Sequence, residues 1–309
     1  MNQHDSATVQ RRPVIPGSPI VRSGLLWGLL GVLAFSFTVP FTRVAVAGGG
    51  LPPLFVGAGR AVVAAALAAI ALFATRQALP RGRQWVRVGV VALGVVIGFP
   101  VLTSFALTTA SASHGAVVIA LLPAATAVAA VWRVGERPRP AFWGAAAVGA
   151  VCAVVFAVLQ GGGLGTLRAS DLLLFGAVVA AAIGYAEGGL LSRELGAWQT
   201  ISWALVVAAP VMLVLTALST RGGVSGTASG WWAFAYLGVV SMFLGFFAWY
   251  RGLAIGPMAT VSQVQLVQPV FGIAWAAVLL GESVGWSTVL GGLAVIASAA
   301  LAVRTRSGR

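Results

Sequence analysis

The chain has 309 residues, of which 59% are hydrophobic and only 8% charged, and its mean hydropathy is +0.98. A soluble globular domain carries roughly a quarter charged residues, so this composition excludes a water-soluble protein. The net charge is +13 and lysine is absent, which excludes a P-loop ATPase and a Schiff-base protein because both need a lysine amine. In a membrane protein such positive charge is expected to mark cytoplasmic loops, not a nucleic-acid partner.

Residues 1–22 are polar, contain several Pro and Ser residues, and predict a disordered cytoplasmic tail. Ten apolar runs follow the tail, and each is long enough to cross a bilayer as an α-helix. In chain order these runs are 24–46, 53–75, 86–108, 114–133, 140–159, 171–192, 198–218, 231–252, 257–280 and 285–303. The sequence therefore predicts an all-α membrane protein with ten transmembrane helices in the lipid bilayer.

Arginine concentrates at alternate ends of these runs. If the N-terminus is cytoplasmic, 15 of the 19 arginines lie at cytoplasmic ends, and the other four are Arg43, Arg60, Arg168 and Arg221. Cytoplasmic loops of membrane proteins carry an excess of basic residues. The arginine pattern therefore predicts that both chain termini are cytoplasmic.

One segment of the chain is repeated. Pro123 and Glu136 return, with the same spacing, 146 residues later as Pro269 and Glu282. This spacing predicts two five-helix repeats, 23–160 and 168–305. Because each repeat has an odd number of helices, the second enters the membrane inverted, with Glu136 cytoplasmic and Glu282 external. Inverted repeats around a central site are typical of secondary transporters.

Each half carries the same motifs in the same order: a first helix with an aromatic-Gly pair, a proline in the fourth helix and a closing Gly-Glu, with a Leu-Pro-Pro turn at 51–53 before Arg60. This pattern resembles the EamA branch of the drug/metabolite transporter (DMT) superfamily over nearly the whole chain. The resemblance implies a ten-helix carrier in the bacterial inner membrane that exports amino acids or related metabolites, and bacterial exporters of aromatic amino acids belong to this branch. No cofactor is expected.

Polar side chains gather on one face of the ninth run. Spaced by three residues, they are Ser262, Gln265 and Gln268. The corresponding positions of the fourth run are apolar: Ala116, Ile119 and Leu122. Amides in lipid are expected to face a cavity or another helix. One polar and one apolar wall suit an amino acid with a large side chain, and hydrogen bonding between helices is the alternative interpretation.

Further substrate-binding candidates are aromatic residues away from the expected headgroup layers: Phe37, Phe99, Tyr185, Phe271 and Trp275. Arg60 lies about 12 Å into the second helix at 1.5 Å per residue, where it would meet a substrate carboxylate or the carbonyl end of a neighbouring helix. Snorkelling to the outer interface is the favoured interpretation. Pro123 and Pro269 each remove a mid-helix hydrogen bond and are candidate hinges, or else fixed packing kinks.

Two titratable residues are candidates for proton coupling. Glu187 is the one acidic residue predicted inside a span, although a pair with Arg193 at the membrane interface is the favoured interpretation. His114 is the sole histidine outside the tail, and solvation at the interface is its favoured interpretation. Both a coupled carrier and an uncoupled facilitator therefore remain open.

An enzyme is not expected, because two histidines, one cysteine and scattered acids offer neither a paired acid, a Ser/His couple nor a metal cluster. The Gly- and Ala-rich runs at 144–149 and 291–292 predict close packing of the fifth and tenth helices. Such faces join either the two repeats or two copies of the chain, so a monomer and a homodimer are both open. The expected partners are lipid and a small amino-acid-like or drug-like solute.

Overall fold

The computed structural model describes residues 19–134, 140–160, 168–255 and 263–306. All regular elements within these segments are helical. Seven helical stretches in them are long and apolar enough to cross a membrane, and shorter apolar helices cover Pro140–Phe156, Val264–Leu280 and Trp286–Leu301. The protein is therefore an all-helical, multi-pass membrane protein.

The first half of the chain contains α1 (Pro19–Ser36), α2 (Thr38–Arg43), η1 (Val44–Gly48), α3 (Pro53–Ala74), α4 (Arg83–Val91), η2 (Ala92–Gly98), α5 (Phe99–Ala106), α6 (Ala112–Ile119), α7 (Leu122–Val134) and α8 (Pro140–Gln160). Helix α1 begins inside the predicted tail, because Pro19 suits a first helical turn, where its missing N–H costs nothing. Residues 1–18 lie outside the described segments.

The second half contains α9 (Ala169–Leu195), α10 (Ala197–Ser219), α11 (Ala228–Tyr236), η3 (Leu237–Leu244), α12 (Gly245–Ile255), η4 (Gln263–Val267), α14 (Gln268–Leu280) and α15 (Trp286–Arg306). The π-helical segments η2 and η3 occupy corresponding positions under the shift that relates Pro123 to Pro269. Such π-helical segments are rare and frequently lie at functional sites.

The two prolines predicted as hinges lie where helices are broken. Helix α6 ends at Ile119, and Pro123 occupies the first turn of the separate helix α7. Pro269 likewise occupies the first turn of α14, after the 3-10 segment η4. A proline is tolerated in a first turn because its missing N–H has no partner there. The predicted mid-helix kinks are therefore breaks between two helical segments.

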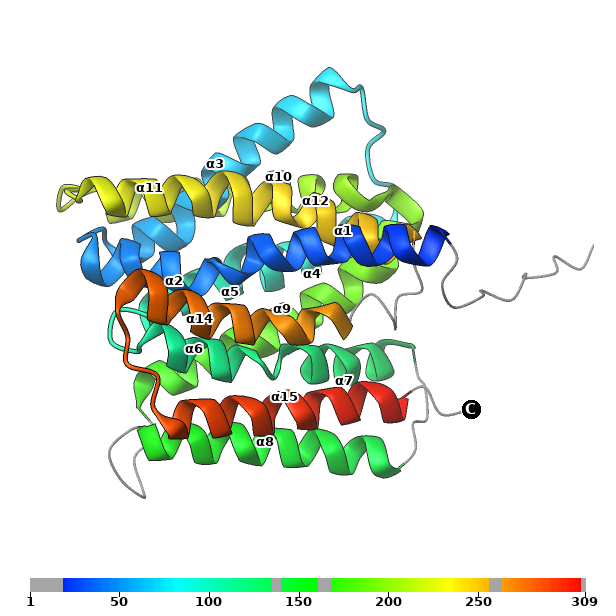
Figure 1. Ribbon diagram of the computed structural model, residues 1–309. Coiled ribbons are helices and arrows are strands. Elements are labelled where there is room, and N and C mark those ends of the chain that lie inside the picture. The colour runs from blue at the N-terminus through cyan, green and yellow to red at the C-terminus, as the bar shows by residue number, and fades with distance from the viewer. Residues whose placement is uncertain (1–18, 135–139, 161–167, 256–262, 307–309) are drawn as a thin grey trace, which may run out of the picture.

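The helices pack in pairs that repeat across the chain. Helix α3 packs on α10, α6 on α14, and α8 on α15, while α1 packs on α12 as α9 packs on η2 and α5. Figure 1 shows α8 and α15 side by side at one edge of the bundle, and the start of α1 and the end of α15 lie at the same end of the bundle. We call this the Arg-rich end, for Arg81, Arg83 and Arg133, and the other the far end.

Candidate functional site

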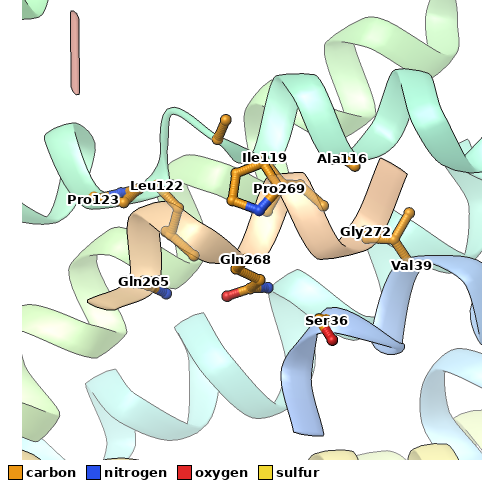
Figure 2. Close-up of a pocket in the computed structure, with 11 residues that line it drawn as sticks. Ser36, Val39, Ala116, Ile119, Leu122, Pro123, Gln265, Gln268, Pro269 and Gly272 are labelled. Carbon is orange, nitrogen blue, oxygen red and sulfur yellow. The ribbon is translucent and has the colours of Figure 1, made fainter. Parts of the chain in front are cut away.

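A narrow pocket lies in the middle of the bundle, where the broken helices meet α1 (Figure 2). Its walls come from Ser36 of α1, from Ile119 and Pro123 on either side of the α6–α7 break, and from Gln268 and Pro269 at the start of α14. The cavity volume is only about 10 Å³, roughly the room for one water molecule. We call this the central pocket.

Two amide groups of the central pocket are incompletely hydrogen-bonded. Gln265 is only 4% exposed, and its Nε2 donor has no partner, while the Oε1 acceptor of Gln268 also has none. Gln268 lies between its own helix and Ser36 in Figure 2. The predicted polar face is thus brought to the pocket, and these two atoms do not join helices. Ser262, the third member of this face, lies outside the described residues.

Aromatic rings separate the central pocket from the far end. The ring of Phe37 stacks on Trp275, with centroids 4.4 Å apart, and Phe41 contacts Tyr236 at 4.8 Å. Trp275 Nε1 donates a hydrogen bond of 3.0 Å to Ser36 Oγ, which ties the stack to the pocket wall. We call Phe37, Phe41, Tyr236 and Trp275 the aromatic barrier. Phe271 packs against Trp275 at 6.4 Å, at the edge of this barrier.

Beyond the aromatic barrier a large cavity opens at the far end. Its volume is about 1200 Å³, and its walls include Phe41 and Tyr236 of the barrier together with Arg43, Trp232 and Glu282. We call it the vestibule. The aromatic barrier therefore contacts the vestibule through Phe41 and Tyr236 and the central pocket through Trp275.

The remaining aromatic candidates lie away from the central pocket. Tyr185 of α9 packs against Phe246 and Trp249 of α12, at 6.0 and 6.5 Å between ring centroids. Phe99 packs against a hydrophobic core cluster that both halves of the chain share. The polar tips of Trp249 and Tyr250 have no hydrogen-bond partner, so this second aromatic cluster also contains unsatisfied polar atoms.

Arg60 is buried in the bundle, 1% exposed, so the snorkelling interpretation was wrong. Its guanidinium donates to the hydroxyls of Thr42 at 3.4 Å and Thr103 at 3.2 Å, and its Nε has no partner. None of the carboxylates in the described segments forms an ion pair with it. Burying a cation without an anion is costly, because the charge loses its hydration shell.

Ion pairs close the Arg-rich end. The Glu187 carboxylate of α9, whose side chain is 6% exposed, pairs with Arg87 of α4 and with Arg133 of α7. Arg87 also pairs with Glu194. The sequence favoured Arg193 as the partner of Glu187, but the observed partners come from two other helices. The two contacts of Glu187 fasten α4, α7 and α9 together, and we call these two contacts the ion-pair latch.

The sequence favoured a solvated side chain for His114 at the membrane interface, but the structure buries it. It is 8% exposed, stacks on Phe156 at 5.2 Å, and its Nε2 lies 2.6 Å from Oδ1 of Asp171. Asp171, which the sequence placed at the flank of a span, is 1% exposed. Because His114 and Asp171 belong to different helices, only their packing reveals the pair.

Glu282 caps the first turn of α6 at the far end. Its carboxylate accepts hydrogen bonds from the N–H groups of Ala112 at 2.8 Å and Ser113 at 2.9 Å. A carboxylate is favoured there because a helix N-terminus carries unpaired N–H donors and partial positive charge. Glu136, its counterpart in the repeat, lies outside the described residues.

The two ends of the molecule differ at corresponding positions. The shift that relates the two prolines places Arg87 and Arg133 of the ion-pair latch on Ala233 and Leu279, which line the vestibule. The molecule is therefore fastened by charges at the Arg-rich end and open between apolar side chains at the far end. The described residues contain no cluster of three or more potential metal ligands.

The sequence was compared with known families and structures. The model of the EamA-like transporter family matches residues 22–159 and again 168–304. The chain belongs to the EamA-like transporter family. The resemblance read from the sequence motifs is thus confirmed, and the protein is a membrane transporter.

Two relatives and one solved structure resemble this EamA-like transporter over most of its length. It is 46% identical to the "Uncharacterized transporter YdeK" of Bacillus subtilis (strain 168), over 91% of this chain and 97% of that protein. It is 27% identical to the "Probable terminal-alkyne amino-acid exporter" of Streptantibioticus cattleyicolor, over 93% of this chain and 96% of that protein. A crystal structure with 21% identity and a TM-score of 0.63, covering 91% of this chain and 98% of that chain, has the same fold.

Proposed function

We propose that this EamA-like transporter is a secondary carrier that exports neutral or aromatic amino acids and related metabolites across the bacterial inner membrane. The observation that carries the proposal is the central pocket, with its unpaired amide atoms, between two broken helices at corresponding positions of the chain. Broken helices that surround a midplane site are typical of secondary transporters.

Alternating access between two inverted five-helix repeats is supported by the packing pattern. If the ten expected membrane helices are numbered in chain order, α1 belongs to the first, η2 and α5 to the third, α9 to the sixth and α12 to the eighth. Exchanging each helix of the first repeat with its counterpart in the second converts the pair α1–α12 into the pair formed by α9 with η2 and α5. The same exchange leaves the pairs α3–α10, α6–α14 and α8–α15 unchanged. The seven long spans and the three shorter apolar helices together supply the ten helices that this arrangement requires.

The excess of arginine at the Arg-rich end supports a cytoplasmic location for this end and for both termini. The vestibule then opens to the outside, and the ion-pair latch closes the cytoplasmic side. The conformation described is accordingly outward-facing, with the central pocket closed by the aromatic barrier. Opening to the cytoplasm requires that the ion-pair latch separate and that the segments joined at Pro123 and Pro269 change their angle.

The substrate class follows from the groups around the pocket. Gln265 Nε2 offers a donor and Gln268 Oε1 an acceptor, which suits the carboxylate and ammonium groups of an amino acid. Phe37 and Trp275 offer flat rings against which an aromatic side chain can stack. Arg60, a buried cation without an anion, is a second site for the carboxylate during passage. The relative named as an amino-acid exporter supports the same class.

A second candidate function is the export of uncharged metabolites or drugs, with or without ion coupling. It is favoured by the apolar part of the pocket wall, formed by Val39, Ile119 and Leu122. Such a surface gains free energy from contact with any apolar group, at about 25 cal/mol per Å² buried. Amino acids with large side chains and apolar drugs would both use this wall.

Transport by the purified protein in proteoliposomes tests the proposal. Radiolabelled L-phenylalanine and L-alanine are loaded, and their efflux is compared with that from protein-free liposomes. We expect saturable efflux of phenylalanine that unlabelled neutral amino acids inhibit. Efflux equal to that of empty liposomes for a full panel of amino acids, together with saturable efflux of an uncharged drug, would favour the second candidate.

A further inference from the structure

A buried histidine–aspartate pair lies at the far end of the bundle, outside the central pocket. His114 Nε2 and Asp171 Oδ1 are 2.6 Å apart, and the side chains are 10% and 1% exposed. We propose that this pair is a proton-binding site through which inward proton movement is coupled to substrate export. The direction of transport in this inference rests on the proposed function. The binding of a proton by the pair is independent of the proposed function.

The hydrogen bonds of Asp171 determine which nitrogen of His114 exchanges the proton. Oδ2 of Asp171 accepts from the main-chain N–H of Arg168 at 2.9 Å, and Asp171 lies in the first turn of α9. Both features stabilise the carboxylate form. A carboxylate partner holds the proton on Nε2 of the imidazole in both charge states. Nδ1 is therefore the atom that binds and releases the transported proton.

The elements packed against α6 bring few other charges to this place. The charged neighbours are Glu282 after α14, Arg43 at the end of α2, and Arg168 before α9. Arg43 donates to the carbonyls of Leu107 and Thr108, before α6 begins. Helix α8 contributes the ring of Phe156 and contains no charged residue, and the charged residues of α15 lie at its other end. His114 thus lies among two carboxylates, Asp171 and Glu282, and two arginines, Arg43 and Arg168.

The helix that carries His114 contacts residues of both the vestibule and the central pocket. Glu282, which lines the vestibule, accepts a hydrogen bond from the main-chain N–H of Ser113, the residue next to His114. Two residues further along α6, Ala116 lines the central pocket. A change of charge on His114 therefore acts on the same short helix that contacts the solute. A proton taken up at Nδ1 from outside and released toward the cytoplasm exchanges for a solute that moves outward.

Proton binding can be measured without a substrate, because the chain contains only His4 and His114. The full-length His4→Gln variant is labelled with ¹⁵N-histidine, placed in lipid nanodiscs and titrated by NMR from about pH 5 to 9. We expect Nδ1 to bind and release a proton over this range while Nε2 stays protonated, and the titration curve of Asp171→Asn to differ from that of the control. An imidazole that keeps one charge state over this range would overturn the proposal.

Coupling is measured in proteoliposomes with labelled L-phenylalanine as the probe. With a pH gradient imposed, the matched control His4→Gln should accumulate phenylalanine as the wild type does. His114→Gln should lose about tenfold or more of this accumulation, while exchange at equal pH falls by about twofold at most. Equal gradient-driven accumulation in both variants would overturn the coupling. If neither the wild type nor the control transports phenylalanine, the proposed substrate is wrong, and the NMR titration still decides whether the pair binds a proton.

Discussion

At the scale of single residues, the central pocket combines unpaired amide atoms with an apolar wall. Leaving a buried donor or acceptor without a partner costs about 1–3 kcal/mol. Gln265 Nε2 and Gln268 Oε1 are in this position, and a solute that bonds to both removes the cost. A solute of similar size that lacks polar groups leaves both amide atoms unpaired, so the cost in free energy remains. The two amides therefore select for polar groups, whereas the apolar wall selects for a large side chain.

Replacing Gln265 by Ala is expected to weaken the binding of every amino acid to the same extent. The loss of one hydrogen bond is worth about 1 kcal/mol, or about fivefold in affinity. Gln199→Ala is the control, because Nε2 of Gln199 bonds to Gln77 at 3.0 Å, far from the pocket along the chain. Binding of phenylalanine and alanine to the purified variants, measured by calorimetry, checks this. An unchanged affinity in Gln265→Ala would show that the amide only packs the bundle.

The ring of Trp275 is expected to discriminate between substrates. Trp275→Ala removes the stacking partner of Phe37, so it should weaken the binding of phenylalanine by about 1 kcal/mol more than the binding of alanine. Trp275→Phe keeps a ring at this place but loses the hydrogen bond to Ser36, and should retain most of the discrimination. Competition assays with both amino acids measure the ratio. Equal losses for phenylalanine and alanine in Trp275→Ala would place the aromatic subsite elsewhere.

At the scale of helices, charged contacts fasten one end of the bundle and apolar side chains line the other. Removing one partner of a buried ion pair leaves the other charge buried and uncompensated. The ion-pair latch thus opposes separation of α4, α7 and α9. The vestibule has no such restraint at the positions of Ala233 and Leu279. This difference favours the outward-facing conformation in the absence of solute.

Glu187→Gln is therefore expected to favour the conformation that is open to the cytoplasm. An Ile119→Cys reporter in a Cys152→Ala background should react several-fold faster with a thiol reagent added from the cytoplasmic side. Glu194→Gln is the matched control, because the Glu194 side chain is 47% exposed and exposed pairs contribute little. Equal reaction rates in the two variants would mean that the ion-pair latch does not hold the Arg-rich end closed.

The contact between α8 and α15 depends on a small residue. A Cβ atom at Gly291 would collide with the ring of Phe156, whereas one at Gly144 would meet no atom within 4 Å. Overpacking a tight contact costs about 1–3 kcal/mol. We expect Gly291→Val to lower the thermal unfolding temperature in detergent and Gly144→Val to change it much less. A similar effect of both substitutions would show that helix propensity, not packing, decides the outcome.

At the scale of the whole molecule, the orientation in the membrane decides which end faces the cytoplasm. Ser283 and Arg81 are both exposed and lie at the far and Arg-rich ends, respectively. In whole cells expressing the Cys152→Ala background, a membrane-impermeant thiol reagent should label Ser283→Cys but should label Arg81→Cys only after permeabilisation. The opposite result would reverse the orientation, and with it the direction in which the vestibule opens.

Some features of this protein follow from local sequence alone. Apolar runs of bilayer length require helices, because lipid offers no partner for unpaired backbone groups. The all-helical membrane class was predicted in this way, the family was predicted from the resemblance of the repeated motifs, and both are confirmed. The spacing of Gln265 and Gln268 placed both on one helix face, and both line the pocket. The positions of Pro123 and Pro269 marked the broken helices, although not the form of the break.

The partners of buried polar groups were decided by tertiary structure. Glu187 is 100 residues from Arg87 and 54 from Arg133, and His114 is 57 residues from Asp171. Sequence reasoning instead paired Glu187 with its helical neighbour Arg193, because only local spacing is visible along the chain. A charge in a membrane must find a partner or water, but many helix arrangements satisfy that condition. Which helices meet, and therefore which charges meet, depends on side-chain packing over the whole bundle.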